Sequence, residues 1–170
     1  MKPVYVFLVV LLTHPALSQP AASPESLLDR MAGKWILQGT IDGKQTTHDV
    51  SAEWILQHQY LQLHEVSREK DLLGHATYEA IVIIGWDERL HQYGCIWLDI
   101  TGGGALSGQA IGRATPKGNE IPFLFKASDT TAFHTTFVYD PKADAWKWVM
   151  DDEEKGKLQP FARVMLKRKR

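Results

Sequence analysis

The residues best suited to chemistry are isolated acids and histidines that share strand faces with aromatic side chains. In the stretch 93–100, alternate positions place Asp99 on the same face as Trp97. A carboxylate beside aromatic rings is costly to bury unless a base or a ligand pairs with it. Asp99 is therefore the first candidate for a binding residue. Two other interpretations stay open: an ion pair with Arg113 or Arg163, or a position at the rim of the fold.

A binding site inside a β-barrel would collect such groups on the inward face of the strands. A register change of one residue would exchange the inward and outward faces, and it would bring in Glu65 and Glu79 instead. Barrels of this size either fill their interior with side chains or enclose one small ligand. The candidate ligand-binding residues are Trp35, His64, Tyr78, Trp97, Asp99, His134 and Arg163.

The histidines show no metal-binding spacing, since neither H-x-H nor H-E-x-x-H occurs. Neither a metal site nor a cofactor is therefore predicted. A zinc site assembled across strands stays open as an alternative. Haem is a second alternative, with His134 as the best axial ligand. His48, His64 and His134 fall on predicted strands, whereas His58, His75 and His91 fall in turns or loops.

No nucleophile motif is present. Cys95 is the only cysteine, which excludes an intramolecular disulfide, and its apolar neighbours predict a buried, unreactive thiol. The glycine run at 102–104 precedes Ser107 without the strand-to-helix elbow that a catalytic serine needs. We expect this run to form a flexible lip where strands bend at a barrel rim.

These residues are carried by a succession of short strands with turn signals between them. Apolar spacing predicts one short helix at 26–31, after which alternation and Gly, Pro and Asp turns predict strands only. The pattern is typical of an all-β, up-and-down antiparallel barrel of about ten strands. The expected strands cover 34–41, 45–56, 60–68, 78–86, 93–100, 106–114, 120–126, 131–139, 145–150 and 159–169, with a charged loop at 151–157.

The first residues indicate export. Lys2, a short apolar run at 4–12 and small residues before position 19 predict a signal peptide at 1–18. The run is too short for a stable membrane anchor. A linker at 19–25 and one barrel domain at 26–170 would follow. We therefore expect a periplasmic or secreted protein.

The net charge and the closed sheet limit which macromolecules the protein is expected to bind. The formal net charge of −1 argues against nucleic acid as a partner. A closed barrel has no free strand edge, so a monomer is expected.

Two groups of residues resemble a bacterial secreted lipocalin-like (calycin-type) family of unknown function. One is Gly33-Lys-Trp35, and the other is the order W-I-L-x3-Y-L, G-W-D and W-L-D, which begins at Trp54. The resemblance runs from about residue 28 to the C-terminus. It implies a calycin-like barrel in which Trp35 plugs one end and a basic residue, Arg163 or Lys167, packs over its ring.

The chain departs from the family pattern at two places, neither of which threatens the fold. Trp86 stands where a tyrosine is usual, and Gln57-His58-Gln59-Tyr60 stands where D-G-R-F is typical. The family has no established catalytic residue, so none carries over.

Three functions remain open. The leading hypothesis is a protein that binds a small apolar or amphipathic molecule in the barrel, because six tryptophans would give a mostly apolar pocket. The second is a small-molecule enzyme in which Asp99 or Glu65 works with a histidine partner. The third is a packed, ligand-free barrel that acts as an interaction module.

Overall fold

The computed structural model describes residues 24–102 and 106–170. The signal peptide expected at 1–18 lies outside the described residues, as do 19–23 of the linker and Gly103 and Gly104 of the predicted lip. The helix is α1 (Pro24–Met31). The strands are β1 (Gly33–Ile41), β2 (Lys44–Ile55), β3 (Tyr60–Ser67), β4 (Glu79–Asp87), β5 (Gln92–Asp99), β6 (Ile111–Ala114), β7 (Glu120–Lys126), β8 (Thr131–Asp140), β9 (Ala145–Glu154) and β10 (Lys157–Arg168).

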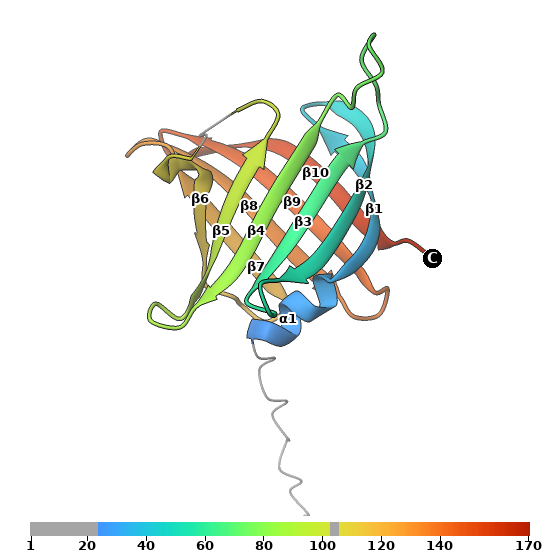
Figure 1. The fold of residues 1–170 in the computed structure, drawn as a ribbon. Coiled ribbons are helices and arrows are strands. Elements are labelled where there is room, and N and C mark those ends of the chain that lie inside the picture. The colour runs from blue at the N-terminus through green and yellow to red at the C-terminus, as the bar shows by residue number, and fades with distance from the viewer. Residues whose placement is uncertain (1–23, 103–105) are drawn as a thin grey trace, which may run out of the picture.

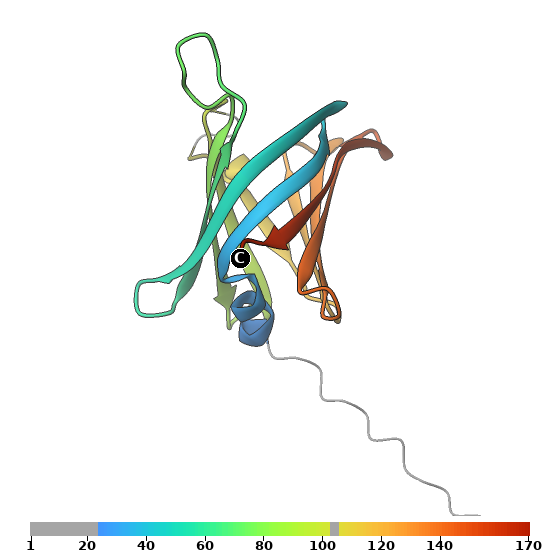
Figure 2. The ribbon, with the colours of Figure 1, turned by 90° about the vertical axis from the view of Figure 1, so that its right-hand side faces the viewer.

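The strands form one closed barrel. Every strand pairs antiparallel with its neighbours in sequence, and β1 also pairs with β10 to close the ring (Figures 1 and 2). The predicted all-β up-and-down barrel of ten strands is confirmed. The predicted helix is confirmed as well, although it begins at Pro24 and so includes the last two residues of the expected linker.

The two ends of the barrel differ. The helix α1 lies across one end, called the closed end here (Figure 1). The β3–β4 loop projects from the opposite end, called the open end (Figures 1 and 2). In an up-and-down barrel alternate strands run in opposite directions, so β1, β3, β5, β7 and β9 all finish at the open end.

Strand alternation decides which side chains face inward. In β4, Ala80, Val82 and Ile84 are buried while the residues between them are partly exposed. Aromatic rings fill much of the interior, and the Trp148 ring stacks on Phe137 with 4.4 Å between ring centroids. Offset aromatic packing of this kind adds to the stability that burial of apolar area provides.

The closed end is sealed by Trp35 and a basic residue of the last strand. The residue is Arg168, whose guanidinium carbon lies 4.0 Å from the centre of the Trp35 ring. The prediction of Arg163 or Lys167 is wrong, because the β1–β10 register pairs Trp35 with Arg168. Gly33 fits this arrangement. Its φ is +128°, and a Cβ there would lie 2.5 Å from the Arg168 Nη1 atom.

Two predicted boundaries are wrong. The charged segment expected as a loop at 151–157 continues β9 to Glu154, and the turn is only Lys155-Gly156, both at positive φ. Charged residues can occupy these positions because this hairpin extends beyond the packed interior. The strand expected at 106–114 is β6 alone, preceded by a 3-10 turn at Gly108–Ala110.

Candidate functional site

A histidine–glutamate pair lies inside the barrel toward its open end. His48 of β2 and Glu65 of β3 are 4% and 2% exposed. The Nδ1 atom of His48 lies 2.5 Å from Oε1 of Glu65. The β2–β3 register places Val50 opposite Glu65 and Ser67 opposite His48. The two side chains are therefore diagonal neighbours on one face, which brings long side chains within reach of each other.

The hydrogen-bond partners of the pair determine which of its atoms carry a proton. The Thr46 hydroxyl donates its only proton to Oε2 of Glu69, at 3.0 Å. The Thr46 oxygen therefore accepts from Nε2 of His48, 2.8 Å away, so that nitrogen carries a proton. One more proton lies between Nδ1 and Glu65. Whichever atom holds it, the pair has no net charge.

Glu69 anchors the outer end of this chain of hydrogen bonds. Burial raises its pKa, but hydrogen bonds from its own backbone, from the Thr47 N–H and from the Thr46 hydroxyl outweigh that effect. The nearby His48 charge acts in the same direction, so the pKa of Glu69 lies below its ordinary value. Glu69 is exposed, whereas Glu65 is buried. The chain therefore connects the surface with the barrel interior.

Tyr78, Trp97 and Asp99 form a second polar group beside the pair. The Trp97 indole N–H donates to the Tyr78 oxygen at 3.2 Å, and the Tyr78 hydroxyl points toward Asp99 Oδ2 at 3.5 Å. The Tyr78 ring stacks on His48 at 5.7 Å between centroids. Burial, followed by the negative charge of Glu65, raises the pKa of the Tyr78 hydroxyl well above its usual range. Tyr78 is therefore a neutral hydrogen-bonding group at ordinary pH.

One oxygen of Glu65 is left for a further partner. Every fully enclosed side-chain nitrogen or oxygen of the described residues has a hydrogen-bond partner. Oε1 of Glu65 is bonded to His48, whereas Oε2 makes no hydrogen bond within the described part of the chain. Oε2 must therefore border accessible space. It offers a free hydrogen-bond acceptor close to the Tyr78 and Asp99 side chains.

Aromatic side chains form the other part of the open end. The Trp97 ring lies 5.5 Å from Trp148 and 6.4 Å from Phe125, measured between centroids. Phe133 and Phe161 pack edge to face at 5.5 Å and are partly buried against the core. The open end thus combines flat apolar surface with a few polar anchors, the composition of small-molecule pockets.

The structure brings together only part of the predicted site. Tyr78, Trp97 and Asp99 share the open end, as expected of one face, while Trp35 lies at the closed end. The expectation that His64, His134 and Arg163 face inward is wrong, because the residues on either side of each of them are the ones that alternate inward. The outer-face pairs are His64 with Glu79 at 2.7 Å, His134 with Glu153 at 2.6 Å and Arg163 with Asp151 at 2.5 Å.

Asp99 occupies the rim of the barrel. It accepts hydrogen bonds from the backbone N–H of Thr101, at 2.8 Å, and from the Thr101 hydroxyl. The alternative of an ion pair with Arg113 or Arg163 is wrong, since Arg113 lies 3.7 Å from Asp87 and Arg163 pairs with Asp151. Of the three interpretations of Asp99, the structure agrees with a position at the rim.

His48 is the residue that the sequence-based selection missed. Glu65 was a candidate only for the alternative register, which is the register that the structure has on β3. The signal for His48 was present in β2, where His48, Val50 and Ala52 recur with a period of two and are all buried. The prediction that Cys95 is buried and unreactive agrees with its surroundings, because burial raises the pKa of its thiol far above the usual range.

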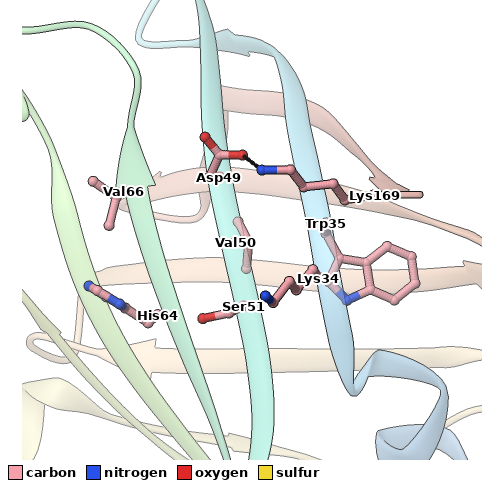
Figure 3. A pocket seen from close by; sticks show the side chains of 8 residues that line it. All are labelled: Lys34, Trp35, Asp49, Val50, Ser51, His64, Val66 and Lys169. Carbon is pink, nitrogen blue, oxygen red and sulfur yellow. Dashed lines mark hydrogen bonds and ion pairs between the residues drawn. The ribbon is translucent and has the colours of Figure 1, made fainter.

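A separate pocket of about 160 Å³ lies on the outer face of β1, β2 and β3, away from the histidine–glutamate pair (Figure 3). Lys34, Ser51 and His64 line it from three adjacent strands, and Asp49 with Lys169 forms its edge. Asp49 is bonded by Arg68 at 2.8 Å and by Lys169 at 3.0 Å, which hold the pKa of its carboxyl far below the usual range. The charges of Asp49, Arg68 and Lys169 thus largely satisfy one another.

Within 24–102 and 106–170, no three His, Cys, Asp or Glu side chains gather as metal ligands would. No helix in the same ranges is both long and apolar enough to cross a membrane.

In comparisons with known proteins, the chain matches no protein-family model and no curated protein sequence. The strand order by itself defines a closed ten-stranded barrel, which is consistent with a calycin-like architecture.

Proposed function

We propose that the protein is a lipocalin-like carrier that binds a small amphipathic molecule in the open end of its barrel. The observation that supports this most is the buried His48–Glu65 pair, whose Oε2 atom borders accessible space. Such a pair contributes little to folding compared with apolar side chains of the same volume. A role in holding a ligand would explain why polar groups occupy these positions.

The arrangement favours a ligand with two parts. Its apolar part would lie on Trp97, Phe125 and Phe133, and its polar part would donate an N–H or O–H to Glu65. Tyr78 and Asp99 would fix the orientation of the polar part at the rim. A neutral pair with one free acceptor fits an uncharged donor better than an anion.

N-phenyl-1-naphthylamine is a suitable probe because it is apolar, carries one N–H and fluoresces in apolar surroundings. Titration of the purified protein should give saturable fluorescence. Trp97→Ala and Glu65→Gln should each weaken binding about fivefold or more, as expected for the loss of an aromatic contact or a buried hydrogen bond. Glu79→Gln is the matched control, since Glu79 lies on the outer face of the adjacent strand β4. Equal binding by all four proteins would contradict the proposal.

A second candidate function is proton transfer, and the 2.5 Å contact between His48 and Glu65 favours it. Glu65 would act as the base toward a substrate through its Oε2 atom, and His48 would hold the carboxyl group in place. Hydrolysis of p-nitrophenyl acetate is a general test, in which His48→Ala should abolish any rate above buffer. His134→Ala removes the comparable outer-face histidine at 2.6 Å from Glu153. Equal rates in both variants would eliminate this candidate.

We also propose export to the periplasm or the exterior after cleavage behind Ser18, and a monomeric state. N-terminal sequencing of the secreted protein should begin at Gln19, and light scattering should give the mass of one chain. A first residue at Met1 in the extracytoplasmic fraction would contradict cleavage.

A further inference from the structure

A second pocket lies at the closed end of the barrel, on the far side from the histidine–glutamate pair. It measures about 120 Å³. Its lining comes from α1, from the end of β2 and the β2–β3 turn, and from the end of β4, the β4–β5 turn and the start of β5. We call it the aromatic pocket, and its lining residues are Leu28, Trp54, His58, Gln59, Trp86, Glu88 and Tyr93.

Two indoles border this pocket without being buried. Trp54 and Trp86 are only partly buried, whereas Trp35, Trp146 and Trp148 in the barrel interior are fully buried. The large apolar area of an indole favours full burial in a closed core. Trp54 and Trp86 pack against the core with part of each ring, and the rest of each ring borders the pocket.

The rings are held in fixed orientations. The His58 ring stacks on Trp54 with 4.0 Å between centroids, and the Trp54 indole N–H donates to Asp29 of α1 at 2.9 Å. Trp86 packs edge to face on Tyr93 at 5.1 Å. An aromatic site whose rings are already oriented loses little conformational entropy when a ligand binds.

The turn that presents His58 has an unusual backbone. Leu56, Gln57 and His58 have φ angles of 49°, 57° and 69°, which non-glycine residues adopt at an energetic cost. This conformation folds the turn back so that the His58 ring covers Trp54. Within the β2–β3 hairpin, non-glycine residues with positive φ occur only in this turn beside the pocket.

Two carboxylates lie at the aromatic pocket. Glu88 lines it, and Asp29 accepts a hydrogen bond from the Trp54 indole N–H and contacts His58 at 3.4 Å. The nearest basic group on α1 is Arg30, whose charge acts on Tyr139 and Asp144, on the β8–β9 side of the barrel. Aromatic faces with a carboxylate beside them attract cations, because the ring quadrupole and the negative charge act in the same direction.

We propose that the aromatic pocket binds a small organic cation, of the size and chemistry of a trimethylammonium group. The cation would lie against the Trp54 and Trp86 rings, with Glu88 supplying the opposite charge. This site is independent of ligand binding at the open end.

The test compares choline with its neutral isostere 3,3-dimethylbutan-1-ol in ¹H–¹⁵N spectra of the labelled protein. The six tryptophans give separate indole N–H signals, and Trp54→Phe and Trp86→Phe assign the two in question. Choline should shift both signals saturably. The isostere should bind about two- to fivefold more weakly, as expected for the loss of a cation–π contact. Equal shifts with both compounds, or no shift of either indole, would overturn the proposal.

Glu88→Gln should weaken choline binding about two- to fivefold. The matched control is Glu154→Gln, an exposed glutamate at the open end that should leave binding unchanged. Co-sedimentation with phosphatidylcholine vesicles separates two sources of the same group. Co-sedimentation that Glu88→Gln reduces would identify a lipid head group as the ligand. Choline binding without co-sedimentation would identify a soluble cation.

Discussion

His48 and Glu65 at the open end depend on each other through a shared hydrogen bond as well as through packing. His48 and Glu65 make one short contact and share one proton, so neither can be removed without leaving the other buried and unsatisfied. Thr46 and Glu69 extend this coupling to the surface. The site is therefore a connected network, and its members should not behave as independent residues.

A double-mutant cycle tests this coupling. His48→Leu and Glu65→Leu should each lower the free energy of unfolding by about 3–5 kcal/mol, because each leaves one buried polar partner alone. The double variant should lose much less than the sum, since apolar side chains replace both partners. Urea unfolding of the four proteins measures this. Additive losses would show that the two side chains are not coupled.

Among the candidate ligand-binding residues, the sequence predicted the positions of the aromatic and acidic side chains better than those of the basic ones. Trp97 and Asp99 could be placed together because a strand alternates strictly and no turn intervenes. His64 and His134 could not be placed, because each lies one position away from an inward-facing residue, Glu65 or Thr135. Register is a property of the whole ring of strands, which a single stretch does not encode.

At the scale of elements, the closed end depends on the last strand reaching α1. Arg168 of β10 covers Trp35 of β1, donates to the carbonyl oxygens of Ala32 and Arg30 at 3.0 and 3.1 Å, and forms a two-pronged bond with Asp144. One side chain thus links β1, the β8–β9 turn, β10 and the helix. Such bidentate pairs carry geometric specificity as well as energy.

The Asp144–Arg168 pair should make stability depend on pH in the acid range. The hydrogen bonds from Arg168 lower the pKa of Asp144 in the folded state. Its contribution is therefore present above the unfolded pKa of about 3.9 and is lost as pH falls below that value. The gap in unfolding free energy between wild type and Asp144→Asn should be largest at pH 7 and should narrow as the pH falls below about 4. Asp129→Asn, in an exposed turn, is the control.

A gap that stays constant from pH 7 to pH 2 would contradict this role of Asp144. Urea midpoints at pH 7, 5, 4, 3 and 2 resolve the trend.

The order of elements could be predicted more fully than their ends. Turn signals such as Asp42-Gly43 and Pro116-Lys-Gly118 divided the chain into the strands that the structure has. The boundaries of β9 and β6 could not be predicted. The acidic run 151–154 stays in β9 because ladder pairing with β8 and β10 satisfies its backbone, a tertiary effect that overrides local polarity.

At the scale of the whole molecule, the barrel has two chemically different ends. The open end holds the buried His48–Glu65 pair beside aromatic rings, and the closed end holds the covered Trp35 ring and the aromatic pocket. Closure of the ring gives every strand a neighbour on both sides. This separation explains how one small domain can carry two sites.

Ligand binding at the open end is the central proposal for this protein, and native mass spectrometry tests it most directly. Wild type and the double variant Glu65→Gln, Trp97→Ala should be purified in parallel from the natural host and sprayed under non-denaturing conditions. We predict that wild type carries a small-molecule mass above that of its chain and that the double variant carries none. Two bare chains, or the same added mass on both proteins, would contradict the account.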